Sequence, residues 1–403
     1  MQALLKENLS FRFLIVFLIS VVLIKCWKQI AYRLHWVDKP DERKTHIGLV
    51  PLVGGVCIYT AIVVTVLILG RKSIELYSYL AAAGALVVVG ALDDKYDISA
   101  RLRLLIEFMA SLIMIYGAGV YVNNLGNLFG QGDILLPMIV AVPFTAIAVA
   151  GYINALNMAD GIDGMAASLG ILTVLCLLIL LHGNYRLFIV PSIALCAALL
   201  AFLVYNLQLV RGLRKVFLGD AGSMFLGFTF AWLVIRFSQG DDRIAAQFSP
   251  VTALFVLGLP LVDMLSTIIR RLKKKQNPLK PDRTHIHHIL LHSGFSPRQA
   301  LAIILTVGAV FHLVGITLHY TQTPDGIQLL AFIFISIIYY QTVINAFRFS
   351  QLIQSFRSVR RRTNHEKPFA QYAHSKDKLA EHGMADHLTH QPKEKHTYKN
   401  QAI

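Results

Sequence analysis

The chain has 403 residues, 55% of them hydrophobic and only 15% charged, with a formal net charge of +15. Its apolar runs repeatedly reach the ~20 residues that cross the hydrocarbon core of a bilayer, so the composition excludes a soluble enzyme and predicts an all-α, polytopic integral membrane protein. The positive charge does not indicate nucleic-acid binding, because much of it lies in short loops and near the C-terminus, where basic residues set membrane orientation and contact anionic lipid.

The apolar runs predict about 11 transmembrane helices. They lie near residues 9–31, 50–70, 77–92, 104–122, 135–153, 165–181, 187–206, 221–237, 249–269, 299–319 and 328–347. The connections between these spans form two alternate sets, and one set holds several times more Lys and Arg than the other. The basic set consists of 32–48, 93–103, 154–164, 207–220 and 270–298. The positive-inside rule makes this set cytoplasmic, so the N-terminus is expected in the periplasm and the C-terminus in the cytoplasm. We therefore expect a membrane domain over residues 1–348 and a polar, disordered cytoplasmic tail over residues 349–403.

Two adjacent carboxylates, Asp93 and Asp94, follow the predicted helix 77–92. The C-terminal end of a helix carries partial negative charge, so carboxylates there cost stability. Neither capping nor solubility explains them, whereas a bound metal, a cationic partner or a shared proton does. Replacing either one by Asn is therefore expected to relieve electrostatic strain while it damages the site. Arg101 and Arg103 come next in the loop and either contact phosphate or only set the orientation of the chain.

The stretch NALNMADGIDG, residues 154–164, lies between two long apolar runs. Its polar residues recur at every third position, which keeps them roughly on one face at a helix end. They are Asn154, Asn157, Asp160 and Asp163. Two carboxylates and two amides form an oxygen-rich surface that suits Mg²⁺ and the phosphates it carries. The alternative is a simple turn in which Asp163 caps the following helix.

A third acidic position is Asp220, within FLGDAGS at the entry of another predicted helix. N-capping explains an Asp at a helix entry well. A metal-ligand role is favoured only by the position of Asp220 on the same predicted membrane face as the other acidic groups. Both interpretations remain open.

The longest predicted cytoplasmic loop, 270–298, holds Arg283, His285, His287 and His288 close together in the sequence. Three histidines suggest zinc, but neither an HExxH motif nor a Cys pair accompanies them. Beside carboxylates suited to Mg²⁺, we expect Arg and His to hold pyrophosphate and to neutralise developing charge.

Two carboxylates, Glu107 and Asp263, lie inside predicted spans. Both are within about two turns of the cytoplasmic face. Ionisable residues at this depth are costly and mark functional sites. The sequence therefore predicts a site at one face of the membrane.

The motifs DDKYD, NALNMADGIDG, LGDAGS and PDRTHIHH occur in this order. With them the chain resembles the polyprenyl-phosphate N-acetylhexosamine-1-phosphate transferases, glycosyltransferase family 4, over roughly residues 10–347. The motif HIHH, together with VDKPDERKTH near the start, resembles the corresponding motifs of one branch of this family, which is found in Gram-negative bacteria. That branch joins UDP-N-acetylglucosamine to undecaprenyl phosphate and begins O-antigen lipopolysaccharide or common-antigen synthesis. The resemblance implies this reaction, with UMP as the second product.

The resemblance also implies a role for each matching residue. It places Mg²⁺, or Mn²⁺ as a substitute, on Asn157 and Asp220. It assigns catalysis to four carboxylates, the first two at the lipid phosphate and the others beside the nucleotide-sugar: Asp93, Asp94, Asp160 and Asp163. It assigns substrate binding to Asn154, Arg283, His285, His287 and His288, with the histidine loop closing over the pyrophosphate.

The partners that the resemblance implies are undecaprenyl phosphate, UDP-N-acetylglucosamine and membrane lipid, with a homodimer as one option for the assembly. The site is expected on the cytoplasmic face of the bacterial inner membrane. Direct attack by the lipid phosphate is favoured because this acceptor is already anionic, while a two-step route through an aspartyl-phosphate remains open.

Two alternatives differ in the substrate or in the class of protein. Another UDP-N-acetylhexosamine is an alternative donor, because no residue visibly distinguishes the sugar hydroxyls. A transporter is the alternative from another class. Transporter sites lie near the bilayer midplane in repeated halves, whereas these motifs are not repeated and occupy one predicted face.

Overall fold

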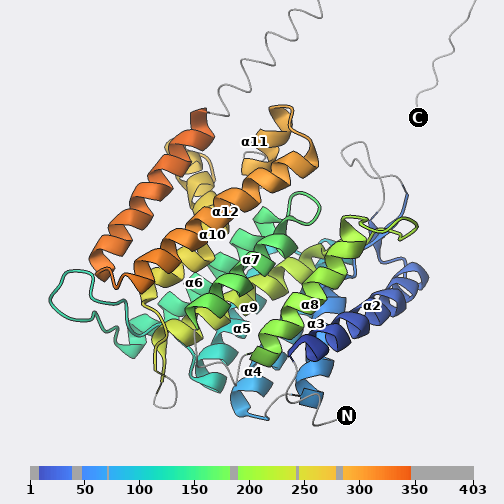
Figure 1. Ribbon diagram of the computed structural model, residues 1–403, viewed down its shortest axis with the longest axis horizontal. Coiled ribbons are helices and arrows are strands. Elements are labelled where there is room, and N and C mark those ends of the chain that lie inside the picture. The colour runs from blue at the N-terminus through green and yellow to red at the C-terminus, as the bar shows by residue number, and fades with distance from the viewer. Residues whose placement is uncertain are drawn as a thin grey trace, which may run out of the picture. The chain divides into compact units, whose positions relative to one another are not determined.

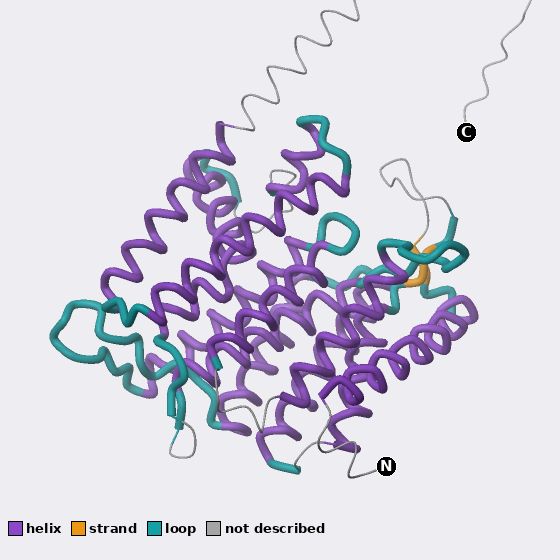
Figure 2. Tube along the Cα trace, viewed as in Figure 1, coloured by secondary structure: helices purple, strands orange, loops and turns teal. Residues whose placement is uncertain are grey.

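The computed structural model describes residues 9–38, 48–69, 72–181, 189–241, 245–277 and 285–345, and within them helices dominate (Figures 1 and 2). The helices are α2 (Leu9–Arg33), α3 (Gly54–Leu69), α4 (Ile74–Tyr96), α5 (Ala100–Leu112), the π-helical turn η1 (Ile113–Gly117), α6 (Met138–Ala159), α7 (Met165–Leu180), α8 (Ile189–Asn206), α9 (Gly219–Gln239), α10 (Pro250–Lys273), α11 (Ile286–His292), α12 (Pro297–Tyr320) and a further helix, Asp325–Asn345. Two short antiparallel strands, β1 (Val37–Asp38) and β2 (Val50–Pro51), follow α2 and precede α3.

The polytopic membrane class is confirmed by the length and composition of the helices. Among the described residues, 7 helices are long and apolar enough to cross a membrane, and three shorter apolar helices accompany them. The predicted span 104–122 corresponds to α5 continued by η1. Eleven spans and the orientation of the termini stay predictions, and the predicted tail at 349–403 lies outside the described residues.

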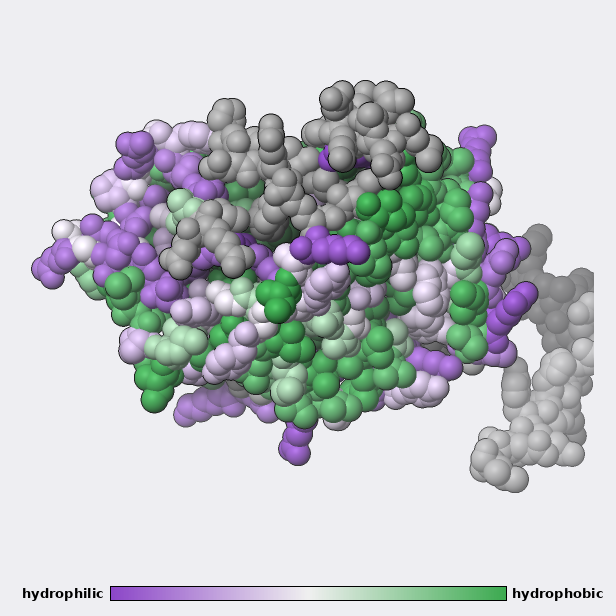
Figure 3. Space-filling model, turned by 90° about the horizontal axis from the view of Figure 1, so that it is seen from below, coloured by the Kyte–Doolittle hydropathy of each residue, from purple (hydrophilic) through white to green (hydrophobic). Residues whose placement is uncertain are grey.

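The surface supports contact with lipid. Large apolar side chains such as Ile139 and Leu330 are 84% and 67% exposed. Figure 3 shows broad hydrophobic areas on one face of the molecule. In water such areas would favour aggregation or binding to another surface, and in a bilayer they match the lipid tails.

Helix α9 lies at the centre of the packing. The apolar stretch of this helix is buried along its whole length, and the helix contacts α3, α4, α6 and α10. Close approach depends on glycine: a Cβ added at Gly55 or Gly90 would overlap the backbone of α9 at Ala221 and Gly222, and one at Gly227 would overlap the backbone of α6. Small residues let membrane helices pack backbone to backbone. This packing holds the N-terminus of α9 against the helices that carry the acidic motifs.

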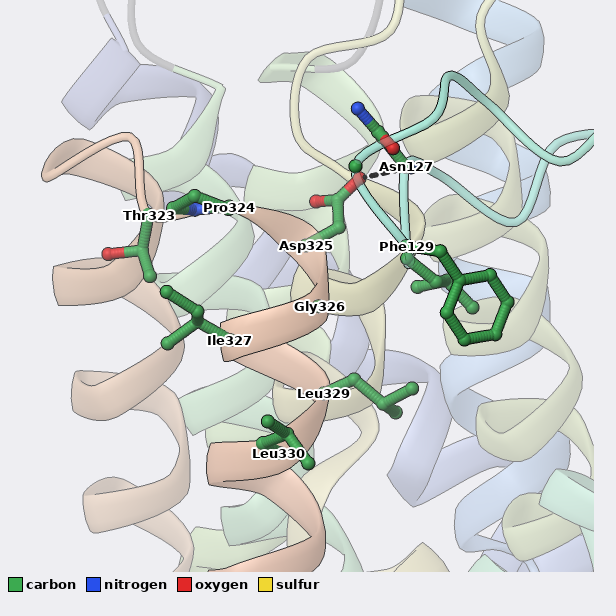
Figure 4. Close-up of a pocket in the computed structure, with 11 residues that line it drawn as sticks. Asn127, Phe129, Thr323, Pro324, Asp325, Gly326, Ile327, Leu329 and Leu330 are labelled. Atoms are coloured by element: carbon green, nitrogen blue, oxygen red, sulfur yellow. Dashed lines mark hydrogen bonds between the residues drawn. The ribbon is translucent and has the colours of Figure 1, made fainter.

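The opposite ends of these helices have separate polar contacts. Arg236, near the end of α9, pairs with Glu75 and Asp241 at 2.9 Å each. Asn127 N donates to Asp325 Oδ2 at 2.8 Å, beside a cavity of about 600 Å³ formed by residues 127–130 and the start of the last described helix (Figure 4). None of the acidic or histidine motifs lines this cavity. The chemistry predicted from the motifs therefore belongs to the other end of the helices.

Candidate active site

Asp94 lies against the N-terminus of α9. Its Oδ1 accepts a hydrogen bond from the backbone N–H of Asp220 at 2.8 Å, and its Oδ2 accepts one from Ala221 at 3.3 Å. Helix α9 has no side-chain cap of its own at Leu218, so Asp94 caps it from a different helix. Gly219 has φ +73°, and a Cβ there would overlap the Asp94 carboxylate. The sequence therefore needs glycine at this position for both backbone conformation and space.

This contact offsets part of the strain expected at the end of α4. The helix continues to Tyr96, so Asp93 and Asp94 lie in its last turn rather than after it. Two N–H groups at the positive N-terminus of α9 offset part of this cost, while burial and the nearby carboxylates of Asp220 and Asp93 still disfavour a charge on Asp94. Asp94 is therefore expected to stabilise the fold as well as shape the site.

Asp93 is also fully engaged. Its Oδ1 accepts the backbone N–H of Ile98 at 2.8 Å, and its Oδ2 accepts from Arg103 Nη1 at 2.6 Å. The same Arg103 nitrogen lies 3.5 Å from Asp220 Oδ2. Arg103 thus joins two acidic motifs, and its side chain is still 25% exposed. A guanidinium placed in this way can also contact a phosphate group.

The carboxylate of Asp220 is not an N-cap, because Leu218 holds that position and Asp220 lies in the first turn of α9. Asp220 Oδ1 instead accepts from Asn157 Nδ2 at 2.8 Å. Asn157 Nδ2 also donates to Ser223 Oγ at 2.8 Å, so both of its hydrogens are used, and no described residue donates to its oxygen. Sequence reasoning missed Ser223, although it lies within the motif LGDAGS.

The two remaining carboxylates of the central motif have different surroundings. Asp163 pairs with Lys215 at 2.5 Å, and α7 begins after Gly164 without a side-chain cap, so the capping alternative for Asp163 is wrong. Burial, with the charges of Asp220 and Asp163 adding to it, raises the pKa of Asp160 to about 7. Asp160 is therefore partly protonated near neutral pH, unlike an ordinary Asp.

Asp263 anchors the histidine segment. Its carboxylate accepts from Ile286 N at 3.3 Å and from Tyr339 OH at 2.7 Å, and it bonds His285 Nδ1 at 2.7 Å. The segment then reaches the central motif: the ring of His287 lies so close to Gly161 that an added Cβ would overlap it. The structure thus brings His287 to the loop 154–164 and His285 to Asp263, whereas Arg283 lies outside the described residues.

His287 is uncharged at neutral pH. Burial, followed by the nearby His288 and His285, lowers its pKa to about 3. No described residue forms a hydrogen bond with its buried Nδ1, while its ring contacts the ring of His288, with centroids 4.1 Å apart. A neutral His287 can offer a hydrogen bond to a substrate but no positive charge. Of the two roles expected from the sequence, it can therefore help to hold pyrophosphate but not neutralise developing charge.

The donor groups of the site fit Mg²⁺ better than zinc. Within the part of the chain that the structure describes, no group of three or more His, Cys, Asp or Glu side chains could hold a metal ion. Asn157 and Asp220 offer only hard oxygen atoms, and Mg²⁺ commonly takes one or two such protein ligands, with water and phosphate oxygens completing the set.

This membrane protein has ordered carboxylates, amides and histidines at one end of its helices. These are features of an enzyme that transfers a phosphate-linked group to a lipid phosphate. A family model described as glycosyl transferase family 4 matches residues 76–238, which hold the first three motifs but not the histidine segment. The chain is 35% identical over 366 residues to the undecaprenyl-phosphate alpha-N-acetylglucosaminyl 1-phosphate transferase of Yersinia pestis, covering 89% of this chain and 98% of that protein. The enzymes of the same name from Escherichia coli (strain K12) and Haemophilus influenzae are 34% and 32% identical, over 88% and 85% of this chain and 96% of each relative. The chain belongs to glycosyl transferase family 4.

Proposed function

We propose that this protein transfers N-acetylglucosamine 1-phosphate from UDP-N-acetylglucosamine to undecaprenyl phosphate, with release of UMP. The names of the relatives support the reaction, and their alignment covers most of each chain. The observation that carries the proposal is the cluster in which Arg103 and Asn157 both contact Asp220, beside Asp93 and Asp94. We place this site on the cytoplasmic face of the inner membrane, because the basic connections lie on the same side.

The bond changes are simple. An oxygen of the lipid phosphate attacks the phosphorus that bears the sugar, and the bond from that phosphorus to the bridging oxygen breaks. UMP leaves with the bridging oxygen. The acceptor is already anionic at neutral pH, so the main barrier is repulsion between two groups of phosphates.

The residues of the chain address this repulsion. Arg103 is held by Asp93 and remains partly exposed, so it can bind a phosphate oxygen. Asn157 and Asp220 would hold Mg²⁺, for which Mn²⁺ is a substitute. When bound, the cation would screen the phosphates and stabilise the charge that leaves with UMP. These groups supply the electrostatic part of catalysis without a strong base.

Direct attack is supported over a two-step route. Asp93 and Asp94 each accept two hydrogen bonds from described residues. A carboxylate acting as a nucleophile would have to leave these donors, which costs free energy in a buried site. The lipid phosphate has no such cost.

The test is incubation of the purified protein with undecaprenyl phosphate and a panel of UDP-sugars, with products identified by mass. The expected products are UMP and undecaprenyl-pyrophosphoryl-N-acetylglucosamine. A product formed only with another UDP-N-acetylhexosamine would replace the proposed donor. Absence of UMP with every donor would reject the transferase.

A further inference from the structure

Glu107 is a buried carboxylate that the proposed chemistry does not use. It is 2% exposed on α5, where only Ala110 and Ser111 are also buried. Much of the rest of α5 is apolar and exposed, as at Leu105 and Met109. An apolar residue would suit the buried face of such a helix, because a buried carboxylate costs free energy unless it is hydrogen-bonded. The contacts of Glu107 therefore point to a specific task.

Glu107 contacts the first amide of the motif NALNMADGIDG. Its Oε2 accepts from Asn154 Nδ2 at 2.6 Å. The same nitrogen donates to the backbone oxygen of Ala150 at 2.9 Å. An Asn side-chain nitrogen carries two hydrogens. Both are used within the protein.

These two contacts fix the orientation of the Asn154 amide. Turning the amide over would place its oxygen against the Glu107 carboxylate and the Ala150 carbonyl, which are both acceptors. In the orientation observed, no described residue donates to Asn154 Oδ1. Asn154 can therefore offer a ligand an acceptor but not an NH₂ group.

Asn157, one turn further along α6, is held in the same manner. Its two hydrogens go to Asp220 and Ser223, and its oxygen is left over. The two amides of the motif thus both keep their oxygen atoms for ligands. A free NH₂ at Asn154 would instead attract phosphate oxygens and compete with Arg103 for them.

We propose that Glu107 is a positioning residue, which keeps Asn154 as the acceptor for a hydroxyl or N–H donor of the bound nucleotide-sugar. This inference rests on the proposed function. Glu107 also attracts Arg103, which lies one turn earlier on α5. Glu107 could act on the site through Asn154 or through Arg103. The variant Glu107→Gln separates these effects, because Gln keeps an acceptor for Asn154 but removes the charge that acts on Arg103.

The experiment compares Glu107→Gln, Glu107→Leu, Asn154→Ala and the double variant Glu107→Leu with Asn154→Ala. UMP release gives kcat and KM for UDP-N-acetylglucosamine at saturating undecaprenyl phosphate, and calorimetry gives the affinity for UDP-N-acetylglucosamine without the lipid. The matched control is Ser111→Ala, because Ser111 is buried on the same face and, among the described residues, its Oγ bonds the backbone oxygen of Glu107 alone.

Glu107→Leu is expected to lose about 30-fold in kcat/KM and in affinity for UDP-N-acetylglucosamine, the size of effect expected when a buried acceptor is removed. Glu107→Gln should retain at least roughly a third of wild-type activity, because the acceptor is restored. Adding Glu107→Leu to Asn154→Ala should cost no more than about twofold, since both changes remove one interaction. Ser111→Ala should stay near wild type.

Three results would overturn the proposal. Glu107→Leu could match Ser111→Ala, Glu107→Gln could be as impaired as Glu107→Leu, or the losses could multiply in the double variant. If wild type releases no UMP, the proposed function fails on its own. The calorimetric comparison of the same variants then still decides whether Glu107 acts through Asn154.

Discussion

The carboxylate of Asp94 caps a helix to which it does not belong: its Oδ1 accepts the backbone N–H of Asp220 at 2.8 Å. One interaction thus joins the end of α4 to the start of α9, and it places two acidic motifs together. The partial positive charge of the α9 N-terminus offsets the partial negative charge of the α4 C-terminus. Asp94 therefore has a structural role that its sequence neighbours do not reveal.

Asp94→Asn is expected to lower both stability and activity. Asn keeps one acceptor oxygen but loses one of the two backbone contacts, and a hydrogen bond of this kind contributes about 1 kcal/mol. The measurement is a melting curve in detergent without Mg²⁺, beside UMP release from the same preparation. Asp97→Asn is the control for stability, because Asp97 is exposed and follows the same helix.

A melting temperature of Asp94→Asn at or above that of wild type would contradict the capping role. That result would restore the interpretation from the sequence alone, in which the two carboxylates are strained against the end of α4. Normal activity in a less stable variant would leave Asp94 purely structural.

Gly161→Ala is expected to disrupt activity without unfolding the membrane helices. The added methyl group would overlap the ring of His287 and push the histidine segment away from the loop 154–164. The expected loss in kcat/KM is at least about 100-fold, as for a misplaced catalytic group. Gly151→Ala on α6 is the matched control, because nothing lies within 4 Å of an added Cβ there. Equal activity in the two variants would show that the contact between Gly161 and His287 is dispensable.

His287 should make stability depend on pH on the acid side. Its pKa is lowered to about 3 in the folded protein, against an ordinary value of 6.5 for histidine. Between these values the unfolded state binds the extra proton, so stability falls as pH decreases from about 6.5 toward 3. Melting temperatures at pH 7.5 and pH 5.0 should therefore differ more for wild type than for His287→Asn. An equal difference in both proteins would show that His287 is not kept neutral by the fold.

The orientation of the chain predicts where the C-terminal end lies. A cytoplasmic reporter fused after residue 349 should be active, and a periplasmic reporter at the same position should be inactive, because the basic connections face the cytoplasm. The reverse pattern would put the site on the side without nucleotide-sugars and would reject the proposed donor.

The proximity of two of the motifs could be predicted from the sequence, because each motif shows its residue types locally, while the roles of these residues stay predictions. The three-residue spacing of Asn154 and Asn157 places both amides at the end of α6, and the structure brings Asn157 to Asp220 as expected of a shared site. The match of the family and of the relatives confirms the resemblance that rested on these motifs.

The partners of the carboxylates could not be predicted, because they come from distant parts of the chain. Capping by Asp94 crosses 126 residues, and the contact of Glu107 with Asn154 crosses 47. Lys215 carries no local signal that it pairs with Asp163. Helix ends are also hard to place: α4 continues to Tyr96 and so includes Asp93 and Asp94 in its last turn.

The central claim is that Asp220 and Asn157 form the catalytic centre rather than a structural contact, and Asp220→Asn tests it most directly. Asp94 still caps α9 in this variant, since that cap uses the backbone N–H of Asp220, so the melting temperature should change by no more than about 3 °C. UMP release from UDP-N-acetylglucosamine and undecaprenyl phosphate, measured across a Mg²⁺ titration, should fall by about 1,000-fold or more at every Mg²⁺ concentration. Near-normal UMP release with an unchanged Mg²⁺ requirement would contradict the account.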